Sequence, residues 1–153
     1  MSAEENKAVV RRFYEELWNA RRMETADEIF AEECVTHQLQ SGAEVTTAGR
    51  SPAALKRHVA EWLEGFPDLR FEVEQMIAEG TEVLSRSVMR GTHAGRWMGV
   101  AASHREVSIR MMVVHRIEGG KIVEDWVLVE SLGFLQQLGL VPPTVEILSK
   151  AAK

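Results

Sequence analysis

The sequence predicts an α+β fold: a cone-shaped roll in which N-terminal helices close the concave face of a curved antiparallel sheet. Two observations predict it. Apolar residues recur at helical spacing within the first 66 residues, whereas strand-like alternation of apolar and polar residues runs from residue 69 to residue 129. Helices followed by a series of strands are typical of α+β proteins. A curved sheet covered in this way would enclose a pocket that is mostly apolar with a few polar groups.

Length and composition indicate one globular domain. The chain has 153 residues, of which 45% are hydrophobic and 27% are charged. This is enough for a single core without disulfides or metals. We expect one domain over residues 1–153, with a compact part over about residues 1–141 and a tail over residues 142–153 that is available to a partner.

Charge and targeting signals restrict the partners and the compartment. The net charge is −5 and no basic stripe is present, which argues against a nucleic-acid partner. The lone Cys34 rules out an intrachain disulfide framework and is typical of a reducing compartment. The polar N-terminus differs from a secretory signal, and no apolar run approaches the ~20 residues of a membrane span. We therefore expect a soluble, cytoplasmic protein with no membrane partner.

Three helices are predicted in the N-terminal part. Ser2 and Glu5 have the spacing of a capping box, and a helical apolar pattern follows them. A short second helix is predicted over Met23–Ala31, followed by a strand over Cys34–Leu39 and a polar loop over Gln40–Gly49. The apolar positions of the first helix are Val10, Phe13, Tyr14, Leu17 and Trp18.

The third helix has the clearest boundaries. Ser51 and Pro52 form a start signal, because serine caps helix N-termini and proline is tolerated at the first helical position. Pro67-Asp68 ends the pattern. The apolar stripe consists of Leu55, Val59, Trp62, Leu63 and Phe66.

Two hairpins are predicted in the C-terminal half. Strands over Leu69–Ala78 and Val83–Thr92 flank a turn at Glu79-Gly80. A longer connection, His93–Arg105, leads to a second hairpin around Gly119-Gly120, and Leu132–Leu138 reads as a short helical turn.

The second hairpin has a face on which ionisable and apolar residues mix. Side chains alternate along a strand, so counting outward from Gly119-Gly120 places His115, Glu124 and Glu130 on one mostly apolar face. Buried ionisable groups are costly unless they are paired or used, so these three are candidates for chemistry. The alternative is a solvated Glu124 at the sheet margin and a hydrogen-bonded core histidine at 115. The remaining members of this face are Val107, Ile109, Met111, Val113, Ile117, Ile122, Trp126 and Leu128.

Four short motifs follow one another along the chain, at Val35–His37, Phe66–Leu69, Gly91–Gly95 and Gly120–Gly139. The longest is the run G-K-I-V-E-x-W-x-x-x-E-x-x-G-x-L-x-Q-L-G. In this order the motifs resemble those of one family, the SnoaL-like polyketide (ester) cyclases of the nuclear-transport-factor-2-like superfamily, and the resemblance extends over most of the chain. It implies the cone-shaped fold and a cofactor-independent aldol ring closure.

The resemblance also implies a catalytic position. Family cyclases use an acidic residue, usually aspartate, four positions after the tryptophan of the last strand, and Glu130 occupies that position after Trp126. Glu130 would be the acid/base, with His115 and His37 supporting an oxyanion. The alternative for Glu130 is a solvated carboxylate at the strand end or one that caps the following helix. The family's proline-rich stretch is replaced by Val100–His104, which leaves the substrate open.

Candidate substrate-binding residues are mainly aromatic, because flat apolar walls suit a polycyclic ligand. For Trp62 and Tyr14 the alternative is an ordinary core position. For His93 the alternative is a histidine that stabilises a turn, and we expect His58 to be solvated. No ligand spacing for a metal and no phosphate loop is present, so we expect no metal and no cofactor. The substrate-binding candidates are Trp126, Trp97, His93, Tyr14, Trp62, Met111, Leu128 and Glu124.

Three functions are consistent with these patterns. The first is a cyclase-like enzyme that removes a proton next to a carbonyl group of a hydrophobic small molecule and closes a ring. The second is a hydratase, isomerase or epoxide hydrolase, although the inward face of Val107–Ile117 lacks the carboxylate that epoxide hydrolysis needs. The third is a non-catalytic module that binds a hydrophobic ligand. Secondary metabolism and detoxification are not distinguished.

The opposite face of the second hairpin predicts a homodimer. Its valines are too apolar to remain in water as one patch, and the same face of a second copy would cover them with two-fold symmetry. The expected outward residues are Val114, Val123, Val127 and Val129, with Arg110, Arg116 and Asp125 pairing at the interface.

Overall fold

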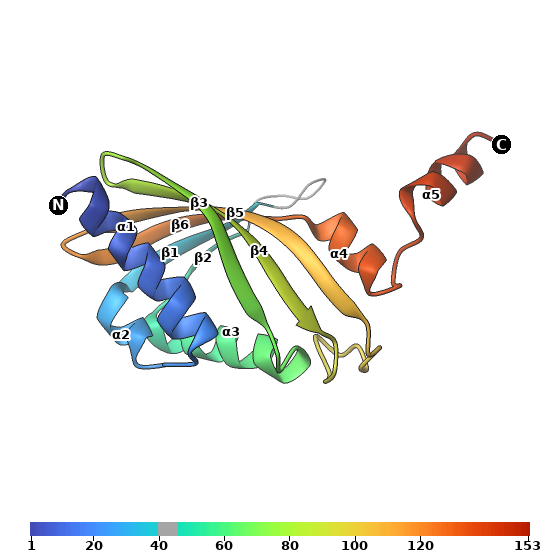
Figure 1. The fold of residues 1–153 in the computed structure, drawn as a ribbon, viewed down its shortest axis with the longest axis horizontal. Coiled ribbons are helices and arrows are strands. Elements are labelled where there is room, and N and C mark those ends of the chain that lie inside the picture. The colour runs from blue at the N-terminus through green and yellow to red at the C-terminus, as the bar shows by residue number, and fades with distance from the viewer. Residues whose placement is uncertain (40–45) are drawn as a thin grey trace.

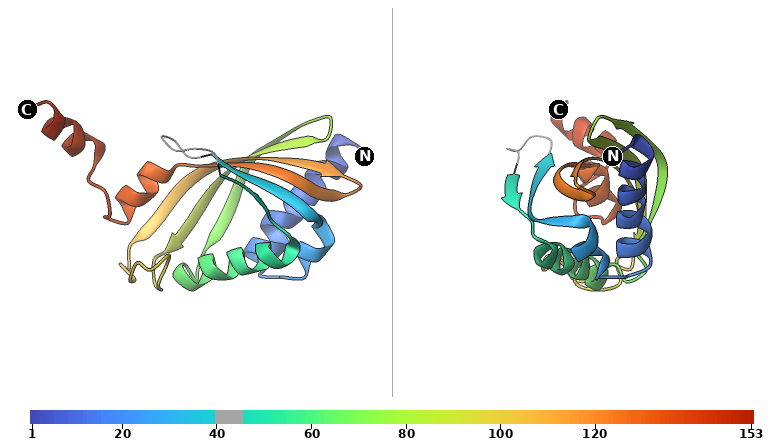
Figure 2. Two further views of the ribbon diagram at one scale, coloured as in Figure 1. Left: turned by 180° about the vertical axis from the view of Figure 1, so that it is seen from behind. Right: turned by 90° about the vertical axis from the view of Figure 1, so that its left-hand side faces the viewer.

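The computed structural model describes residues 1–39 and 46–153 and shows a strongly curved sheet with α1, α2 and α3 on its concave side (Figures 1 and 2). The sheet has six strands in the order β2-β1-β6-β5-β4-β3. The predicted α+β roll is confirmed. The elements are α1 (Ala3–Arg12), η1 (Phe13–Asn19), α2 (Thr25–Ile29), β1 (Phe30–Leu39), β2 (Thr46–Gly49), α3 (Pro52–Gly65), β3 (Arg70–Glu79), β4 (Glu82–Thr92), β5 (Glu106–Glu118), β6 (Lys121–Val129), α4 (Ser131–Gln137) and α5 (Thr144–Ala151).

One pairing departs from the expected all-antiparallel sheet. Strands β1 and β6 run parallel, whereas the other four neighbouring pairs are antiparallel. Hairpins enforce antiparallel pairing only between strands that are joined directly. Because β1 is separated from β6 by most of the chain, its direction is set by the way it leaves α2.

The first helix continues into a π-helix. Ser2 Oγ accepts a hydrogen bond from Glu5 N at 3.2 Å, and Ser2 N donates to Glu5 Oε2 at 2.6 Å, so the predicted capping box is present. In η1 the wider turn is visible in the bond from Ala20 N to Glu15 O, five residues back, at 2.9 Å. Such π segments are frequent at functional sites. The buried residues of η1 are Phe13, Tyr14, Leu17 and Trp18.

Helix α3 begins as predicted, but the segment before it differs. Ser51 Oγ accepts from Ala54 N at 3.2 Å, with Pro52 at the first helical position. Of the predicted loop Gln40–Gly49, residues 40–45 lie outside the described residues, and Thr46–Gly49 forms β2 by pairing with β1. This short edge strand has no strong sequence pattern of its own, since its pairing comes from the neighbouring strand.

The two hairpin turns lie at the predicted glycines, the first one residue further on. Glu79 pairs with Glu82, so Gly80 and Thr81 are the central residues of the β3–β4 turn. At the β5–β6 turn Gly119 and Gly120 have φ values of 56° and 77°. Two consecutive positive φ values are those of a type I′ turn, which matches the twist of the flanking strands.

A β-bulge changes the face of β6. Ile117 pairs with Ile122, but Arg116 pairs with Glu124, so Val123 is an extra residue in β6. An extra residue reverses which side chains point inward beyond it. His115 therefore stands opposite Asp125 instead of facing a glutamate. The predicted shared face of His115 with the even-numbered residues of β6 is wrong beyond the bulge.

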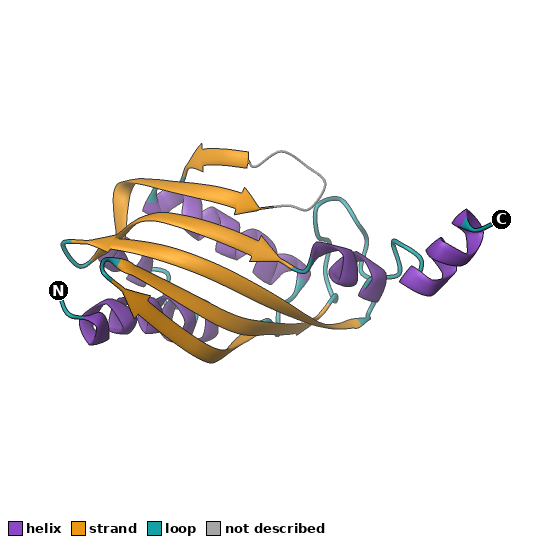
Figure 3. Cartoon of the chain, turned by 90° about the horizontal axis from the view of Figure 1, so that it is seen from above, coloured by secondary structure: helices purple, strands orange, loops and turns teal. Residues whose placement is uncertain are grey.

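The core lies between the concave face of the sheet and the helices. Phe30, Leu55, Phe66 and Ile109 are all fully or almost fully buried there. In contrast, α5 contains no buried residue and projects away from the body of the molecule (Figures 1 and 3). None of the described helices is both long enough and apolar enough to span a membrane.

The bulge also corrects the predicted outward face. Asp125, Val127 and Val129 line the inner side of the sheet instead of an interface. On the outer face Arg110 pairs with Glu74 at 2.6 Å and Arg116 with Glu124 at 2.9 Å, within one chain. The exposed apolar side chains there are instead Ile77, Met112 and Leu128, at 52%, 47% and 42% exposure.

We predict that this outer face associates with the same face of a second copy, because exposed apolar groups on one sheet face favour burial. Leu128→Glu should place a carboxylate in the contact and convert a dimer to a monomer in light scattering at micromolar concentration. Thr81→Glu, at the exposed β3–β4 turn, is the control and should leave the mass unchanged. A wild-type monomer would contradict the prediction.

Candidate functional site

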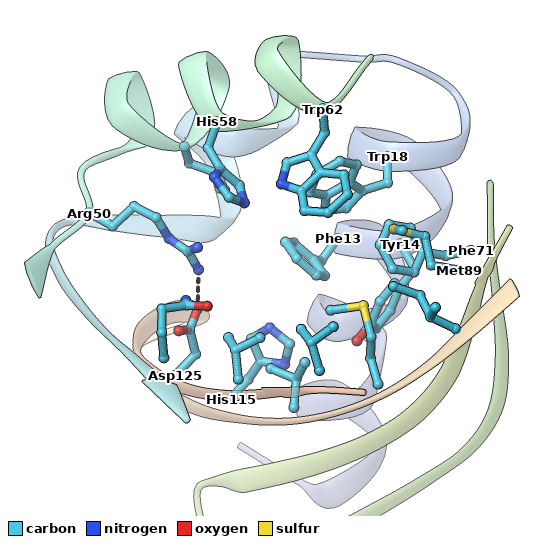
Figure 4. Close-up of a pocket in the computed structure, with 17 residues that line it drawn as sticks. Phe13, Tyr14, Trp18, Arg50, His58, Trp62, Phe71, Met89, His115 and Asp125 are labelled. Carbon is cyan, nitrogen blue, oxygen red and sulfur yellow. Dashed lines mark hydrogen bonds and ion pairs between the residues drawn. The ribbon is translucent and has the colours of Figure 1, made fainter. Parts of the chain in front are cut away.

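An apolar cavity of about 90 Å³ lies between η1, α3 and the concave face of the sheet (Figure 4). We call this cavity the inner chamber. A cavity of this size holds several water molecules or one compact organic group. Its polar and ionisable lining residues are Tyr14, Gln38, Arg50, His58, His115 and Asp125, and its apolar lining residues include Phe13, Trp18, Leu55, Trp62, Phe71, Met89, Ile109, Met111, Val113, Val127 and Val129.

Asp125 is a fully buried carboxylate with a partner on each oxygen. Thr36 Oγ1 donates to Asp125 Oδ1 at 2.5 Å. Arg50 Nη2 forms an ion pair with Oδ2 (Figure 4). Gln38 Nε2 donates to Thr36 Oγ1 at 3.0 Å and extends the network. Arg50 is positioned by its place between β2 and the cap of α3, where its backbone N–H donates to Cys34 O at 2.7 Å. A charge that is taken out of water requires such pairing.

His115 is the least satisfied polar group of the chamber. Its side chain is fully buried, and neither ring nitrogen has a hydrogen-bond partner among the described residues. The pKa of His115 is lowered from 6.5 to about 4, chiefly by burial, while Asp125 raises it and Arg50 lowers it by smaller amounts. The ring is therefore neutral at pH 7. It packs edge-on against Phe13, with ring centroids 5.0 Å apart.

His58 and Tyr14 are also uncharged at neutral pH. Burial, reinforced by Arg50, lowers the pKa of His58 to about 4, against the opposing effect of Asp125. Burial raises the pKa of Tyr14 to about 12, and its hydroxyl shares a 2.7 Å hydrogen bond with Ser85 Oγ. The ion pair compensates its own charge, so the chamber as a whole carries no net charge.

Two further donors at the chamber wall lack partners within residues 1–39 and 46–153. They are the indole Nε1–H of Trp18 and the Nε–H of Arg50. Buried N–H groups without a partner are rare and costly. Together with the free ring nitrogens of His115, they give the chamber both donors and an acceptor for a polar ligand.

Comparison with known proteins identifies the family. The model of the SnoaL-like polyketide cyclases matches residues 8–138. The chain belongs to the SnoaL-like polyketide cyclase family. Comparison with curated proteins gave no match.

Solved structures of similar proteins extend this result. AclR of Streptomyces galilaeus, provisionally assigned as a hydroxylase, is 27% identical with a TM-score of 0.77, over 92% of this chain and 100% of that one. IdmH of Streptomyces antibioticus, provisionally assigned as a polyketide cyclase, is 27% identical with a TM-score of 0.75. The match covers 88% of this chain and 98% of IdmH. A SnoaL-like protein of Jannaschia sp. CCS1 shares the fold. It is 20% identical with a TM-score of 0.78, and the match covers 92% of this chain and 95% of that one.

The residue at the family's acidic position does not lie in the chamber. Glu130 is exposed at the end of β6, where it precedes α4, and it lines a groove on the outer side with Arg86 and Arg110. The predicted placement of Glu130 in the pocket is therefore wrong. The β6 bulge explains this, since it directs the even-numbered residues outward.

Four other expected site residues also lie on the outer face. His37 donates or accepts at 2.8 Å with Glu124 and at 2.9 Å with Thr47. Its ring stacks on Trp126, with centroids 5.1 Å apart and planes 14° apart. Leu128 is exposed on the same face. The predicted placement of His37, Trp126, Leu128 and Glu124 around one pocket with His115 is thus wrong for all four.

The remaining candidates lie inside or close to the chamber. Tyr14, Trp62, Met111 and His115 line it. Trp97 lies further out, in a second cavity. His93 is buried behind Phe66, and its Nδ1 contacts Ser103 Oγ at 3.0 Å, so it holds the 93–105 connection and does not line the chamber.

Four polar residues of the chamber are not predicted from the sequence, and they are Gln38, Arg50, His58 and Asp125. The charged neighbours of His58 predict a solvated side chain, yet it follows Leu55 by three positions and precedes Trp62 by four, which places it on their helix face. Asp125 would have been found only if the bulge had been foreseen. Arg50 has no signal beyond its position before the Ser51 cap.

The described residues include neither a cluster of metal ligands nor a reactive cysteine. No group of three or more His, Cys, Asp or Glu side chains within them is arranged to hold a metal ion. Cys34 is buried, and burial raises the pKa of its thiol to about 12. A thiol with this pKa is unreactive at neutral pH.

We predict that Arg50→Met destabilises this SnoaL-like protein far more than a surface ion-pair change does. The free energy of unfolding in urea should fall by about 3 kcal/mol or more, because Asp125 is left buried without its counter-charge. Arg110→Met, which removes the exposed pair with Glu74, should cost less than about 1 kcal/mol. Arg50→Met combined with Asp125→Leu should recover part of the loss. Equal effects of the two single changes would contradict a buried pair.

We also predict that stability falls on mild acidification. The unfolded chain protonates His115 near pH 6.5, but the folded protein does so only near pH 4, so acid favours unfolding between these values. This residue should cost about 2 kcal/mol between pH 7 and pH 5. His115→Gln should remove that share, whereas His104→Gln, at an exposed histidine, should not. Identical pH dependence in all three proteins would refute the prediction.

Proposed function

We propose that this protein is a cofactor-independent enzyme of the cyclase type, in which His115 removes a proton next to a carbonyl group of a hydrophobic small molecule. The observation that carries the proposal is the position of His115. It is a neutral imidazole in an apolar chamber, opposite the buried Asp125, and neither of its nitrogens has a hydrogen-bond partner in the part of the chain that the structure describes. Perturbed ionisable groups in a cavity are candidates for catalysis.

His115 is a suitable base although its pKa is low. At pH 7 it is almost entirely in the neutral form that accepts a proton. A base with a pKa between about 4 and 5 is adequate for enolisation when the site also stabilises the enolate. The imidazolium that forms faces the carboxylate of Asp125, which favours the charged ring. Asp125 itself is a poorer base, since both of its oxygens are already engaged.

The negative charge on the enolate oxygen requires donors. The Nε–H of Arg50 and the Nε1–H of Trp18, which have no acceptor among residues 1–39 and 46–153, are two donors of residues that line the chamber. Fixed donors in a site that excludes water stabilise developing charge more effectively than water does. Arg50 would thus hold Asp125 with one nitrogen and the enolate with another.

Ring closure follows from the same groups. The enolate carbon attacks a second carbonyl of the same molecule, forming a carbon–carbon bond and an alkoxide. The imidazolium of His115 then returns its proton to that alkoxide, so no external acid, base or oxidant is consumed. This step draws on membership of the SnoaL-like polyketide cyclase family and on the similarity to IdmH.

Other reactions fit less well. Similarity to AclR supports a hydroxylase-like reaction at the same coarse level. A hydratase or isomerase could use the same base. Epoxide hydrolysis needs two carboxylates beside an arginine, and Asp125 is the one carboxylate among the described lining residues of the inner chamber. A non-catalytic binding module would use the ring nitrogens of His115 to hold a polar ligand, and it differs from an enzyme in showing no proton exchange.

Proton abstraction can be tested without the natural substrate. We expect the protein to accelerate exchange of the α-protons of 2-tetralone in D₂O, followed by NMR. His115→Gln should lower the rate by ~10²–10⁴, because a general base is removed. Glu130→Gln, which changes the family's acidic position outside the chamber, is the control and should retain the wild-type rate. If His115→Gln kept the wild-type exchange rate and Glu130→Gln lost it, Glu130 instead of His115 would be the general base.

The pH dependence of the exchange separates His115 from His58. The wild-type rate should be constant at neutral pH and fall through a pKa of about 4, that of either histidine. His58→Gln should keep this acidic limb, whereas His115→Gln should abolish it. An acidic limb that disappears only in His58→Gln would make His58 the base.

A further inference from the structure

The last helix, α5, has an apolar face that the described part of its own chain does not cover. Val145 and Leu148 are three positions apart and share one side of the helix, with Ile147 beside them. Glu146 and Lys150 form a 2.7 Å ion pair on the opposite side. Val145 and Leu148 are 79% and 63% exposed, and none of the residues of α5 is buried. The helix is therefore amphipathic, and its apolar side is in solvent.

A helix as short as α5 needs packing from another surface. It has eight residues, and isolated helices shorter than about 12–15 residues are marginal in water even when they consist of good helix formers. Val145 and Ile147 are β-branched, which lowers helix propensity further. The residue before the helix, Pro143, has no side-chain hydrogen bond that would cap it. The stability of α5 therefore has to come from contact with a second molecule.

The connection from α4 to α5 directs the helix away from its own body. Pro142 and Pro143 precede α5, and proline fixes the backbone angle φ. Gln136 Nε2 donates to Pro142 O at 3.0 Å and to Thr144 Oγ1 at 3.1 Å, which ties the start of α5 to α4. As a result, α5 lies on the opposite side of the sheet from α3 (Figures 1 and 2). This is the side from which a second copy would approach the outer face.

A groove on the outer face, beside α4, has the matching properties. It has a volume of about 710 Å³, and we call it the outer groove. Its charged lining residues, Glu74, Arg86, Arg110 and Glu130, sum to no net charge, as do Glu146 and Lys150 of α5. The two methionines of the groove have adaptable side chains of the kind that is common at protein-binding surfaces. Its apolar lining residues are Met111, Met112, Leu128, Val129 and Leu132.

We propose that α5 of one copy lies in the outer groove of a second copy, whose own α5 lies in the groove of the first. Exchange of an identical element between two copies is a low-cost route to a dimer, and two-fold symmetry closes it at two. Each chain contributes one helix and one groove, so a single assembly buries both apolar surfaces in equal number. Met112 and Leu128 belong both to the groove and to the exposed outer face, so the exchanged helix extends the same-face contact expected there.

Cysteine pairs divided between two chains test the exchange directly. Leu148→Cys and Leu132→Cys, at the apolar side of α5 and the edge of the groove, are co-expressed with different affinity tags and oxidised with diamide. We expect a disulfide-linked dimer that carries both tags, and the same for Val145→Cys in place of Leu148→Cys. The native Cys34 does not interfere, because it is buried and the pKa of its thiol is raised to about 12.

The control and the contradicting outcomes use the same assay. Leu148→Cys co-expressed with Thr81→Cys, at the exposed β3–β4 turn, should stay unlinked. Absence of a two-tag dimer from both arm positions, Val145 and Leu148, would overturn the proposal. A link to Leu132→Cys that forms only when both cysteines are in one chain would place α5 in its own groove and also overturn it.

The dimer dissociation constant gives a second measurement, by sedimentation equilibrium. Leu148→Gln removes an apolar contact from each of the two arms, so dissociation should become easier by about tenfold for each arm, or about a hundredfold in all. Lys150→Gln, on the polar side of α5, is the matched control and should leave the constant unchanged. An unchanged constant in Leu148→Gln would contradict the exchange. If that dimer still dissociated in Leu128→Glu, the same-face contact would stand without it.

A membrane surface is the competing occupant, because amphipathic helices also lie on lipid. Co-sedimentation with vesicles of phosphatidylglycerol and phosphatidylcholine should leave the wild-type protein in the supernatant. Vesicle binding that is lost in Leu148→Gln, in a protein that gives no two-tag disulfide, would assign α5 to lipid and refute the exchange.

Discussion

The ion pair between Arg50 and Asp125 is the interaction on which the arrangement of the chamber depends. A carboxylate removed from water needs partners on both oxygens, and these partners come from different elements. Thr36 is on β1, Arg50 lies between β2 and α3, and Asp125 is on β6. The pair therefore forms only when the parallel β1–β6 register, the β1–β2 pairing and the start of α3 are all correct at the same time.

The same pair leaves burial as the main influence on the pKa of the two chamber histidines. Its positive and negative ends act in opposite directions on the pKa of both His58 and His115, and burial then dominates. A chamber with an unpaired arginine or aspartate would favour one protonation state strongly. With the pair intact, the imidazole of His115 remains neutral and yet lies opposite a carboxylate that can stabilise its charged form.

The fold was largely predictable because its signals are local. The Ser51-Pro52 start of α3 and the Gly119-Gly120 turn are each determined by a few neighbouring residues, and both were located correctly. The same holds for the order of helices and strands. The bulge at Val123 was not predictable, because the apolar residues of β6 fall on both parities. From the sequence, Val127 and Val129 are as suitable for the inward face as Trp126 and Leu128 are.

The candidate site was predicted only where it depends on one element. His115 and Met111 lie on β5 before the turn, so their face follows from simple alternation, and Tyr14 and Trp62 follow from helical spacing. Arg50 and Asp125 meet only through tertiary pairing, which no local pattern encodes. The placement of Glu130 failed because the position came from a family motif, whereas its direction depends on the register of this chain.

Two of the chamber's walls contain an irregularity of the backbone. The β6 strand carries one extra residue at Val123, and η1 is wound more widely than an α-helix. Each irregularity decides which side chains reach the ligand without altering the course of the chain. A relative that lost the codon for Val123 would have a regular β6 with the same neighbouring pairs, Ile117 with Ile122 and Arg116 with Glu124, so Asp125 would still face the chamber. The bulge thus absorbs one residue and leaves the side chains beyond it in place, whereas a single added or lost codon that the strand does not absorb in this way would exchange its two faces.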